Sequence, residues 1–172
     1  MRKISVTALK TAGFTAGEQI LLSGVIYTAR DAAHIRFMQL LDSGQPLPFP
    51  VNGGVLYYTG PTPAPPGGII GSCGPTTASR MDIFTPRLLA LGLAATIGKG
   101  SRSPAVTEAM QAAGCLYLCA VGGAGAVLAQ SVTAAEIAAF EDLGCEAVYK
   151  LTVRDMPLIV GIDARGESVF AR

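Results

Sequence analysis

The chain has 172 residues with a formal net charge of +1, and 50% of its residues are hydrophobic against 15% charged. This length fits one domain with a sizeable core, and the near-neutral charge excludes a broad basic surface for nucleic acid or anionic membranes. Because so few charged residues are available to cover the surface, we expect a large interface with a partner protein.

Two uncharged runs, 43–79 and 109–135, have the length of membrane spans. The first contains eight prolines and the second is interrupted by glycines, so neither has the composition of a membrane helix. Near the N-terminus, Lys10 and Glu18 interrupt the apolar residues before they reach the length of a signal peptide. We therefore expect a cytoplasmic protein with no membrane contact.

The four cysteines, Cys73, Cys115, Cys119 and Cys145, form no CxxC pair. This spacing argues against a zinc site, a redox dithiol and a secreted disulfide framework. Cys115 and Cys119 fall on one predicted strand, where a spacing of four residues places them on the same face but about 13 Å apart. They cannot share a metal ion, and we predict buried free thiols.

Residues 1–18 alternate weakly in polarity and predict an N-terminal arm or edge strand, before a domain formed by residues 19–172. Residues 19–27 are rich in β-branched and aromatic side chains and predict a strand. A helix then begins, capped by Thr28 or Asp31 and closed by residues 43–44.

Arg30 therefore lies at a strand-to-helix junction, where the free amides and partial positive charge of a first helical turn favour a bound anion. Arg30 and Asp31 also fit a local ion pair, which is a common and weak surface feature. His34, the only histidine, lies one turn further on. A single histidine on a helix is more often a hydrogen-bonded structural group than a ligand or base, so we place it beside the site.

Residues 71–82, Gly-Ser-Cys-Gly-Pro-Thr-Thr-Ala-Ser-Arg-Met-Asp, are the strongest candidate for a ligand-binding loop. The glycines permit backbone angles that let several amides point inward, the threonines offer hydroxyls, and the arginine is a planar fork that matches a carboxylate or phosphate. The residues concerned are Gly71, Gly74, Thr76, Thr77 and Arg80. Helix caps and tight turns use the same residue types. No charged residue lies between Asp42 and Arg80, and this isolation favours a buried, selected charge.

The remaining pattern alternates between strands and helices, as in α/β proteins. Strands are predicted at 54–59, 93–97, 115–121, 136–140, 147–153 and 158–163, and helices at 85–91, 105–113 and 124–131. A second loop with glycines and cations, 98–104, contains Lys99 and Arg102. It lacks the spacing of a nucleotide-binding loop, which argues against ATP or GTP, and its cations are suitable partners for carboxylates.

Five motifs occur in one order, at residues 22–24, 27–34, 71–82, 98–103 and 141–144. With these motifs the chain resembles the β subunit of class I fumarases, which corresponds to the C-terminal domain of single-chain iron-sulfur fumarases and is similar to the β subunit of L-tartrate dehydratase. The resemblance spans nearly everything after residue 20. It implies an α/β fold, a swivelling β/β/α domain with a mixed sheet.

The resemblance also implies a partner and a cofactor. In that family a [4Fe-4S] cluster is held by three cysteines of the α subunit, so the cysteines of this chain are not ligands and this chain alone holds no metal. The expected partners are the α subunit, in a dimer of αβ pairs, and a C4 dicarboxylate substrate.

By the same resemblance, Arg30, Arg80 and Lys99 bind the substrate carboxylates in the reversible hydration of fumarate to L-malate, and Thr76 carries the proton. A threonine hydroxyl is a weak base, so it needs activation by amides, cations or an acidic residue of the α subunit. The residues expected to support this site are Asp31, His34, Gly74, Thr77, Asp82 and Arg102. Two alternatives remain, the β subunit of L-tartrate dehydratase and a non-catalytic dicarboxylate-binding module. The loop 98–103 resembles the fumarase version more than the tartrate version, which favours fumarate.

Overall fold

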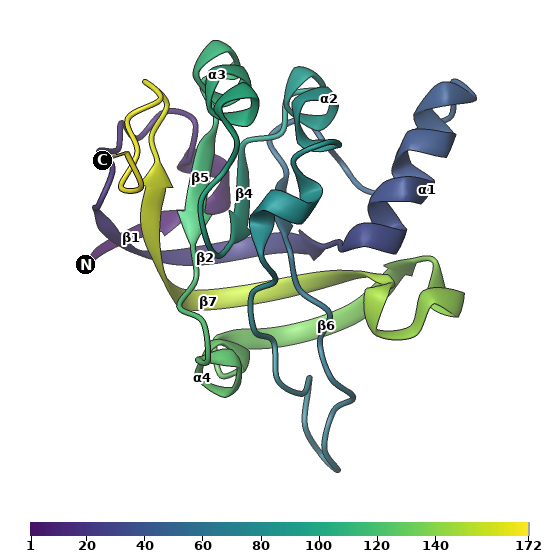
Figure 1. Cartoon of the computed structure of the whole chain (residues 1–172). Helices are drawn as coiled ribbons and strands as arrows, with labels where there is room; N and C mark the ends of the chain where they lie inside the picture. Colours follow the sequence, from purple (N-terminus) through teal and green to yellow (C-terminus); the bar gives the residue numbers. More distant parts are fainter. Residues whose placement is uncertain (172) are drawn as a thin grey trace.

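The computed structural model describes residues 1–171, which form a single mixed sheet of seven strands with helices packed around it (Figure 1). The strands are β1 (Arg2–Ser5), β2 (Gln19–Thr28), β3 (Val55–Tyr57), β4 (Ala95–Gly98), β5 (Leu116–Cys119), β6 (Val132–Ala139) and β7 (Val148–Ile162). The α-helices are α1 (Asp31–Asp42), α2 (Thr85–Ala90), α3 (Pro104–Ala113) and α4 (Gly125–Ala129). Short 3-10 helices are η1 (Val6–Ala8), η2 (Ala78–Met81) and η3 (Glu141–Glu146). The predicted α/β class is confirmed.

The sheet closes into a barrel because β7 is long enough to pair at both sides of the parallel strands. Strands β2, β3, β4 and β5 are parallel neighbours, and β7 runs antiparallel to both β5 and β2. β1 adds to β2 as a further parallel strand and β6 adds to β7 as an antiparallel one. The residues predicted as an edge strand or arm therefore include a strand of the sheet.

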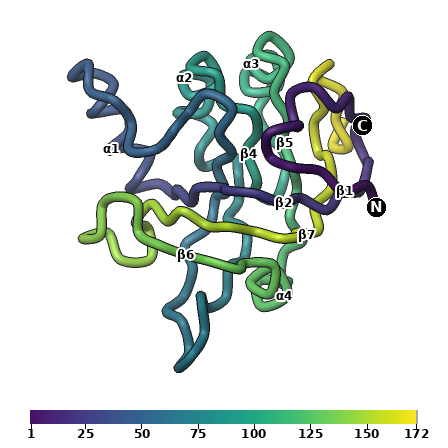
Figure 2. The backbone as a smooth tube through the Cα atoms, turned by 180° about the vertical axis from the view of Figure 1, so that it is seen from behind, coloured from purple at the N-terminus to yellow at the C-terminus, as the bar shows by residue number. Residues whose placement is uncertain are grey.

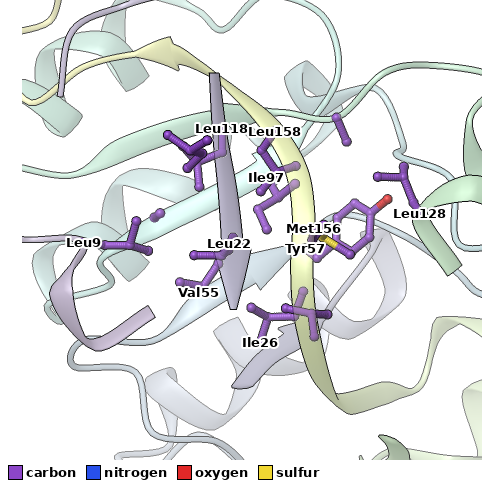
Figure 3. Close-up of a cluster of buried hydrophobic side chains, with 14 of the residues drawn as sticks. Leu9, Leu22, Ile26, Val55, Tyr57, Ile97, Leu118, Leu128, Met156 and Leu158 are labelled. Carbon is purple, nitrogen blue, oxygen red and sulfur yellow. The ribbon is translucent and has the colours of Figure 1, made fainter. Parts of the chain in front are cut away.

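Two apolar clusters lie on the two faces of this sheet. The inner cluster fills the barrel with β-branched and other aliphatic side chains, such as Leu22, Val55 and Ile97, which Figure 3 shows together. The outer cluster contains Phe37, Leu56 and the side chains of α2 and α3 that cover the strands. Alternate residues of β3 thus face opposite clusters, as the period of two in a strand requires.

Three helices line one side of the barrel, α1, α2 and α3, while α4 lies on the other (Figures 1 and 2). α1 begins at Asp31, and its N-cap is Arg30 rather than either predicted cap, Thr28 or Asp31. It ends at Asp42, shortly before Gly44, whose φ is 68°. α3 is capped by the Ser103 hydroxyl, which accepts from Val106 N, and ends at Gly114 in the left-handed conformation. These caps are the local sequence signals that set the helix bounds.

Two sequence-based predictions of strand bounds are wrong. The strands predicted at 147–153 and 158–163 are one strand, β7, because Asp155, at φ 51°, lies opposite a register shift in β2 that lets pairing continue. β6 begins at Val132 rather than at residue 136, since it pairs with β7 from Val153 onward and leaves only five residues for α4.

The proline-rich segment after β3 forms a hairpin that projects from the barrel (Figures 1 and 2). Its two arms meet where Thr62 N donates to Ser72 O, at 3.0 Å, and Gly71 N donates to Thr62 O, at 3.1 Å. Within the described part of the chain, no helix is long and apolar enough to cross a membrane.

Candidate functional site

The site begins with the topology, because the four parallel strands all end at one edge of the barrel. The pairing aligns Thr28 with Tyr57, Tyr57 with Ile97, and Ile97 with Leu118. Residues that follow these positions therefore share that edge, the position where open α/β sheets bind ligands. Arg30 follows β2 and Lys99 follows β4, so two of the predicted carboxylate-binding residues lie at this edge of the barrel.

Arg30 is held between the start of α1 and two loops. Its Nε lies 3.2 Å from Glu146 Oε1 and 3.9 Å from Asp31 Oδ2, and this buried Nε has no hydrogen-bond partner among residues 1–171. Gly60 leaves the necessary room, since a Cβ there would lie 3.1 Å from Arg30 Cδ. The contact with Glu146 is therefore electrostatic, without the geometry of a hydrogen bond.

Arg80 joins the same group through Asp31. Its Nε and Nη2 donate to the two oxygens of Asp31 at 3.1 and 2.9 Å, so one carboxylate contacts both arginines. The expectation that Arg80 is a buried charge is wrong, because its side chain is 51% exposed. It lies in the last turn of η2, where solvent reaches the guanidinium.

Thr76 and Lys99 are brought together by main-chain hydrogen bonds. Thr76 N donates to Tyr58 O at 2.6 Å, and Lys99 N donates to Thr76 O at 3.2 Å. Thr77 forms an isolated parallel bridge with Lys99, and Thr76 is half-buried while Thr77 and Lys99 are exposed. Lys99 takes part in no ion pair within the part of the chain that the structure describes.

The loop 71–82 differs from the prediction in how it uses its backbone. Main-chain amides that were expected to point inward donate instead to protein acceptors, in Gly71, Ser72, Cys73, Thr76 and Ala78. Neither Gly71 nor Gly74 has a positive φ. Gly71 is required by close approach, because a Cβ there would lie 2.2 Å from Thr62 Oγ1. Ligand contacts in this loop must therefore come mainly from side chains.

Two buried hydroxyls hold the loop 71–82 from the barrel side, and the sequence did not indicate them. Tyr57 donates to Cys73 O at 2.5 Å, and Thr59, two residues after β3, donates to Gly74 O at 2.7 Å. These two bonds hold the turn before Thr76. Figure 3 shows the Tyr57 hydroxyl pointing toward Leu128 of α4, which belongs to the same buried cluster. Burial raises the pKa of Tyr57 far above its usual range, so the phenol remains a donor.

The glycine motif at 122–125 supports the same loop by close packing. Cys73 N donates to Gly125 O at 3.0 Å, and a Cβ at Gly125 would lie 2.3 Å from Ser72 Oγ. A Cβ at Gly122 would lie 3.6 Å from Lys99 Cδ. The turn between β5 and α4 therefore lies against both cation-bearing loops.

Arg102 is placed differently from the other cations, because its side chain is completely buried. Its Nε donates to Asp82 Oδ1 at 2.6 Å, and its two terminal nitrogens donate to Thr96 and Thr85 hydroxyls at 3.0 and 2.7 Å. The guanidinium lies 5.3 and 5.1 Å from the ring centroids of Tyr58 and Tyr117. The carboxylate that Arg102 meets is therefore Asp82, and Arg102 is inaccessible to a ligand.

Asp82 connects two loops through this pair. Its second carboxylate oxygen accepts from Ser103 N at 2.6 Å, while Tyr117 donates to Gly100 O at 2.8 Å. The loop that contains Arg80 is thereby tied to the loop that contains Lys99. Asp82 and Tyr117 thus connect the two loops without being exposed cations themselves.

His34 is buried beside Arg30. Its Nδ1 lies 2.7 Å from Arg30 O, and its Nε2 is buried with no partner among residues 1–171. Burial lowers the pKa of His34 to about 4, so the imidazole is neutral at physiological pH. This agrees with its placement as a structural group beside the site.

Glu146 is a residue of the site that the local sequence did not reveal. Its carboxylate accepts from Ala32 N at 3.2 Å, and so occupies part of the helix N-terminus that the sequence offered to a bound anion. It comes from η3, more than a hundred residues from Arg30 in sequence, and no local pattern signals such a contact.

Among residues 1–171, no group of three or more His, Cys, Asp or Glu side chains could hold a metal ion. Cys73 and Cys115 are buried free thiols, Cys119 is half-buried, and Cys145 is exposed, which corrects the prediction that all four are buried. Burial raises the pKa of Cys73 to about 11, so it is not a thiolate at neutral pH. These residues do not fit an iron-sulfur cluster.

The cations and Thr76 lie at an open surface. Thr77, Arg80 and Lys99 are exposed there, and Thr76 is half-buried. Exposed aliphatic residues occur nearby in sequence, Ile83 after Asp82 and Val121 before Gly122, with exposed fractions of 83% and 58%. A charged cluster beside exposed apolar side chains is typical of a site completed by a second surface.

The chain is similar to known proteins over nearly its whole length. The family model described as "Fumarase C-terminus" matches residues 2–172. The chain is 36% identical over 173 residues to "Fumarate hydratase 2" of Leishmania major, and 38% identical over 159 residues to "Fumarate hydratase class I, aerobic" of Escherichia coli K12. These alignments cover 99% and 91% of this chain but only 30% and 29% of the relatives, so the chain spans about a third of their length.

A shorter relative matches over most of its own length. The "Putative L(+)-tartrate dehydratase subunit beta" of Methanocaldococcus jannaschii is 36% identical over 160 residues, covering 90% of this chain and 82% of the relative. The family match and these relatives show that this chain belongs to the fumarase C-terminus family.

Proposed function

We propose that this chain is the β component of a class I fumarate hydratase, which interconverts fumarate and L-malate. The observation that carries the proposal is the convergence of Arg30, Arg80 and Lys99 with Thr76 at the carboxyl ends of four parallel strands. A C4 dicarboxylate has two carboxylates, and three separate cations can bind both of them while a hydroxyl reaches a carbon between them.

The role of the arginines follows from their free edges. Arg80 uses Nε and one hydrogen of Nη2 for Asp31, which leaves Nη1 and the other Nη2 hydrogen for a substrate carboxylate. The carboxylates of Asp31 and Glu146 lie on the Nε side of Arg30 and fix the orientation of its guanidinium. The terminal nitrogens of Arg30 are therefore held in a defined orientation before substrate binds. Preorganisation of this kind lowers the entropy cost of binding the substrate.

The role of Thr76 is proton transfer. In the dehydration direction, the C3–H bond of malate breaks, its electron pair forms the C2=C3 double bond, and the hydroxyl group leaves C2. Thr76 accepts the C3 proton in this proposal and returns it during hydration. A cation favours the deprotonated form of a neighbouring hydroxyl, and Lys99, whose main chain is hydrogen-bonded to Thr76, is the candidate.

A [4Fe-4S] cluster belongs to the α subunit in this proposal, because the cysteines of this chain do not fit one. When bound there, the cluster would act as the Lewis acid for the departing hydroxyl. Everything assigned to this chain is binding, orientation and movement of one proton. The complete enzyme is then a heteromer, proposed as a dimer of αβ pairs in the cytoplasm, and the relative named as a subunit beta supports a partner.

Fumarate and malate are preferred over tartrate in this proposal. Tartrate carries an additional hydroxyl at C3, and an enzyme for tartrate should present a polar partner there. An apolar wall rejects an added hydroxyl by only about a hundredfold, so some turnover of tartrate is expected. The tartrate dehydratase assignment remains the second candidate because one relative at 36% identity carries that name.

The test is reconstitution with the α subunit under anaerobic conditions. We expect kcat/KM for L-malate to exceed kcat/KM for L-tartrate, and the isolated chain to contain no iron or sulfide and to be inactive. A ratio that favours tartrate would replace the assignment by tartrate dehydratase. Absence of turnover for both acids, with dicarboxylate binding retained, would support a non-catalytic dicarboxylate-binding module.

A further inference from the structure

His34 links the two arginines of the site although it touches no solvent. Its ring lies 5.5 Å from the ring of Phe84 at an interplanar angle of 29°, and 5.5 Å from the ring of Tyr58 in an edge arrangement. Phe84 follows Arg80 in the same loop, with Phe84 N donating to Met81 O at 3.0 Å. The imidazole therefore packs between α1, which begins after Arg30, and the segment that presents Arg80.

The hydrogen bond of Nδ1 fixes the tautomer. Its partner, Arg30 O, can only accept, so Nδ1 carries the hydrogen and Nε2 has the lone pair. Protonation of Nε2 would place a charged donor in a buried position with no acceptor among residues 1–171. His34 is therefore a neutral donor with one defined role, directed at the main chain of Arg30.

This bond is not needed to satisfy the helix. Arg30 O already accepts the ordinary helical bond from His34 N, at 2.9 Å, so the ring adds a second donor to a satisfied carbonyl. The side chain of Arg30 makes no helix-capping hydrogen bond. A second donor at this carbonyl restrains the peptide that carries Arg30, at the point where β2 gives way to α1.

We propose that His34 is a positioning residue, which sets Arg30 through its Nδ1–H bond and keeps Arg30 and Arg80 at a fixed separation through its contact with Phe84. The inference rests on the proposed function insofar as these arginines bind the substrate carboxylates. His34 itself touches neither substrate nor the reacting atoms in this account.

Three substitutions of His34 distinguish a role of Nδ1 from a role of Nε2 and from the packing of the ring. His34→Asn places an amide N–H near the position of Nδ1, His34→Gln places its amide near Nε2, and His34→Phe keeps an aromatic ring without a donor. We expect KM for malate to rise about tenfold in His34→Phe and His34→Gln, with kcat within about twofold of wild type, because loss of one hydrogen bond weakens substrate binding by about this factor. In His34→Asn, KM is expected to stay within about threefold of wild type.

Phe37→Leu is the matched control. The ring centroids of Phe37 and His34 lie 5.6 Å apart, and Phe37 belongs to the outer apolar cluster. A phenylalanine side chain has no donor for a hydrogen bond to Arg30 O. It should lower the melting temperature and leave KM unchanged. If His34 only stabilised the fold, its variants would behave like this control.

The tautomer is measured independently of activity. Because the chain contains a single histidine, labelling it with 15N-histidine gives one set of imidazole signals in the reconstituted complex. We expect protonated Nδ1 and unprotonated Nε2 across neutral pH.

Either an Nε2–H tautomer or a His34→Phe variant with unchanged KM in an active complex would overturn the inference alone. A His34→Gln variant that restores KM while His34→Asn does not would also overturn it, since the functional atom would be Nε2. A wild-type complex that turns over neither malate nor tartrate would instead overturn the proposed function, and the nitrogen signals would still report on His34.

Discussion

Two arginine-aspartate pairs near the site, Arg102–Asp82 and Arg80–Asp31, have the same chemistry but opposite surroundings. Arg102 and Asp82 have side-chain exposures of 0% and 13%, and each of the three kinds of guanidinium nitrogen of Arg102 has an acceptor in the protein. Arg80 and Asp31 have exposures of 51% and 32%, and Arg80 uses only one edge of its fork.

The difference separates support from binding. A buried pair that is fully hydrogen-bonded cannot exchange its carboxylate without leaving a charge unpaired in the interior. An exposed pair is screened by water and contributes little to stability, so its free edge can accept a second carboxylate at small cost. Arg102 thus fixes the loops, and Arg80 is available to a ligand.

The largest effect is expected from breaking the buried pair. Arg102→Met leaves the Asp82 carboxylate without its cation, and removal of one partner of a buried pair costs about 3–5 kcal/mol. We expect the free energy of unfolding, measured by urea denaturation, to fall by this amount.

Arg87→Met is the control for that experiment. Arg87 pairs with Asp42 at 2.5 Å, but the side chains are 45% and 67% exposed, so no measurable change in stability is expected. If Arg102→Met were as stable as this control, Arg102 would not support the loops.

Thr76→Val tests the exposed site, in contrast to the buried pair. The shape persists while the hydroxyl is lost, so exchange of the C3 proton of malate in deuterated water should slow by about a hundredfold or more. Succinate binding and the melting temperature of the reconstituted complex should be retained. Exchange at the wild-type rate would exclude Thr76 as the proton carrier.

Arg80→Lys keeps the charge but loses the planar fork. One lysine ammonium cannot bind Asp31 and a substrate carboxylate with paired hydrogen bonds, so kcat/KM should fall by about tenfold to a hundredfold. The unfolding free energy should stay near that of wild type, in contrast to Arg102→Met. Near-normal kcat/KM would assign Arg80 a structural role.

The smallest effect is expected for Asp31→Asn. The substitution keeps the size of the side chain and removes a partly exposed charge, so kcat/KM should decrease by about twofold to fivefold. The corresponding change in the buried pair, Asp82→Asn, should lower the melting temperature markedly. Equal loss of stability in the two variants would contradict the division between support and binding.

Local sequence signals were sufficient for the elements that begin the site. The β-branched run before Thr28, the helix start at Asp31 and the glycine beyond Asp42 set β2 and α1, and so the junction that carries Arg30. The order of strands and helices was enough for the α/β class. Such features depend on neighbours in sequence, which the pattern contains.

Features that depend on distant residues were missed. The continuity of β7 depends on its register with β2, and the contact of Glu146 with Arg30 joins η3 to the start of α1. The burial of Arg102 depends on Tyr58, which follows β3, and on Tyr117 of β5. No local pattern distinguishes Arg102 from Arg80, because both lie in glycine-containing loops.

The measurement that tests the central claim most directly is succinate binding to the reconstituted complex. Succinate is a C4 dicarboxylate with no double bond to hydrate and no hydroxyl to lose, so its affinity reports on the carboxylate contacts alone. The account predicts that Arg30→Met, Arg80→Met and Lys99→Met each weaken succinate binding by about tenfold or more, with stability close to wild type. Wild-type affinity for succinate in all three variants would contradict it.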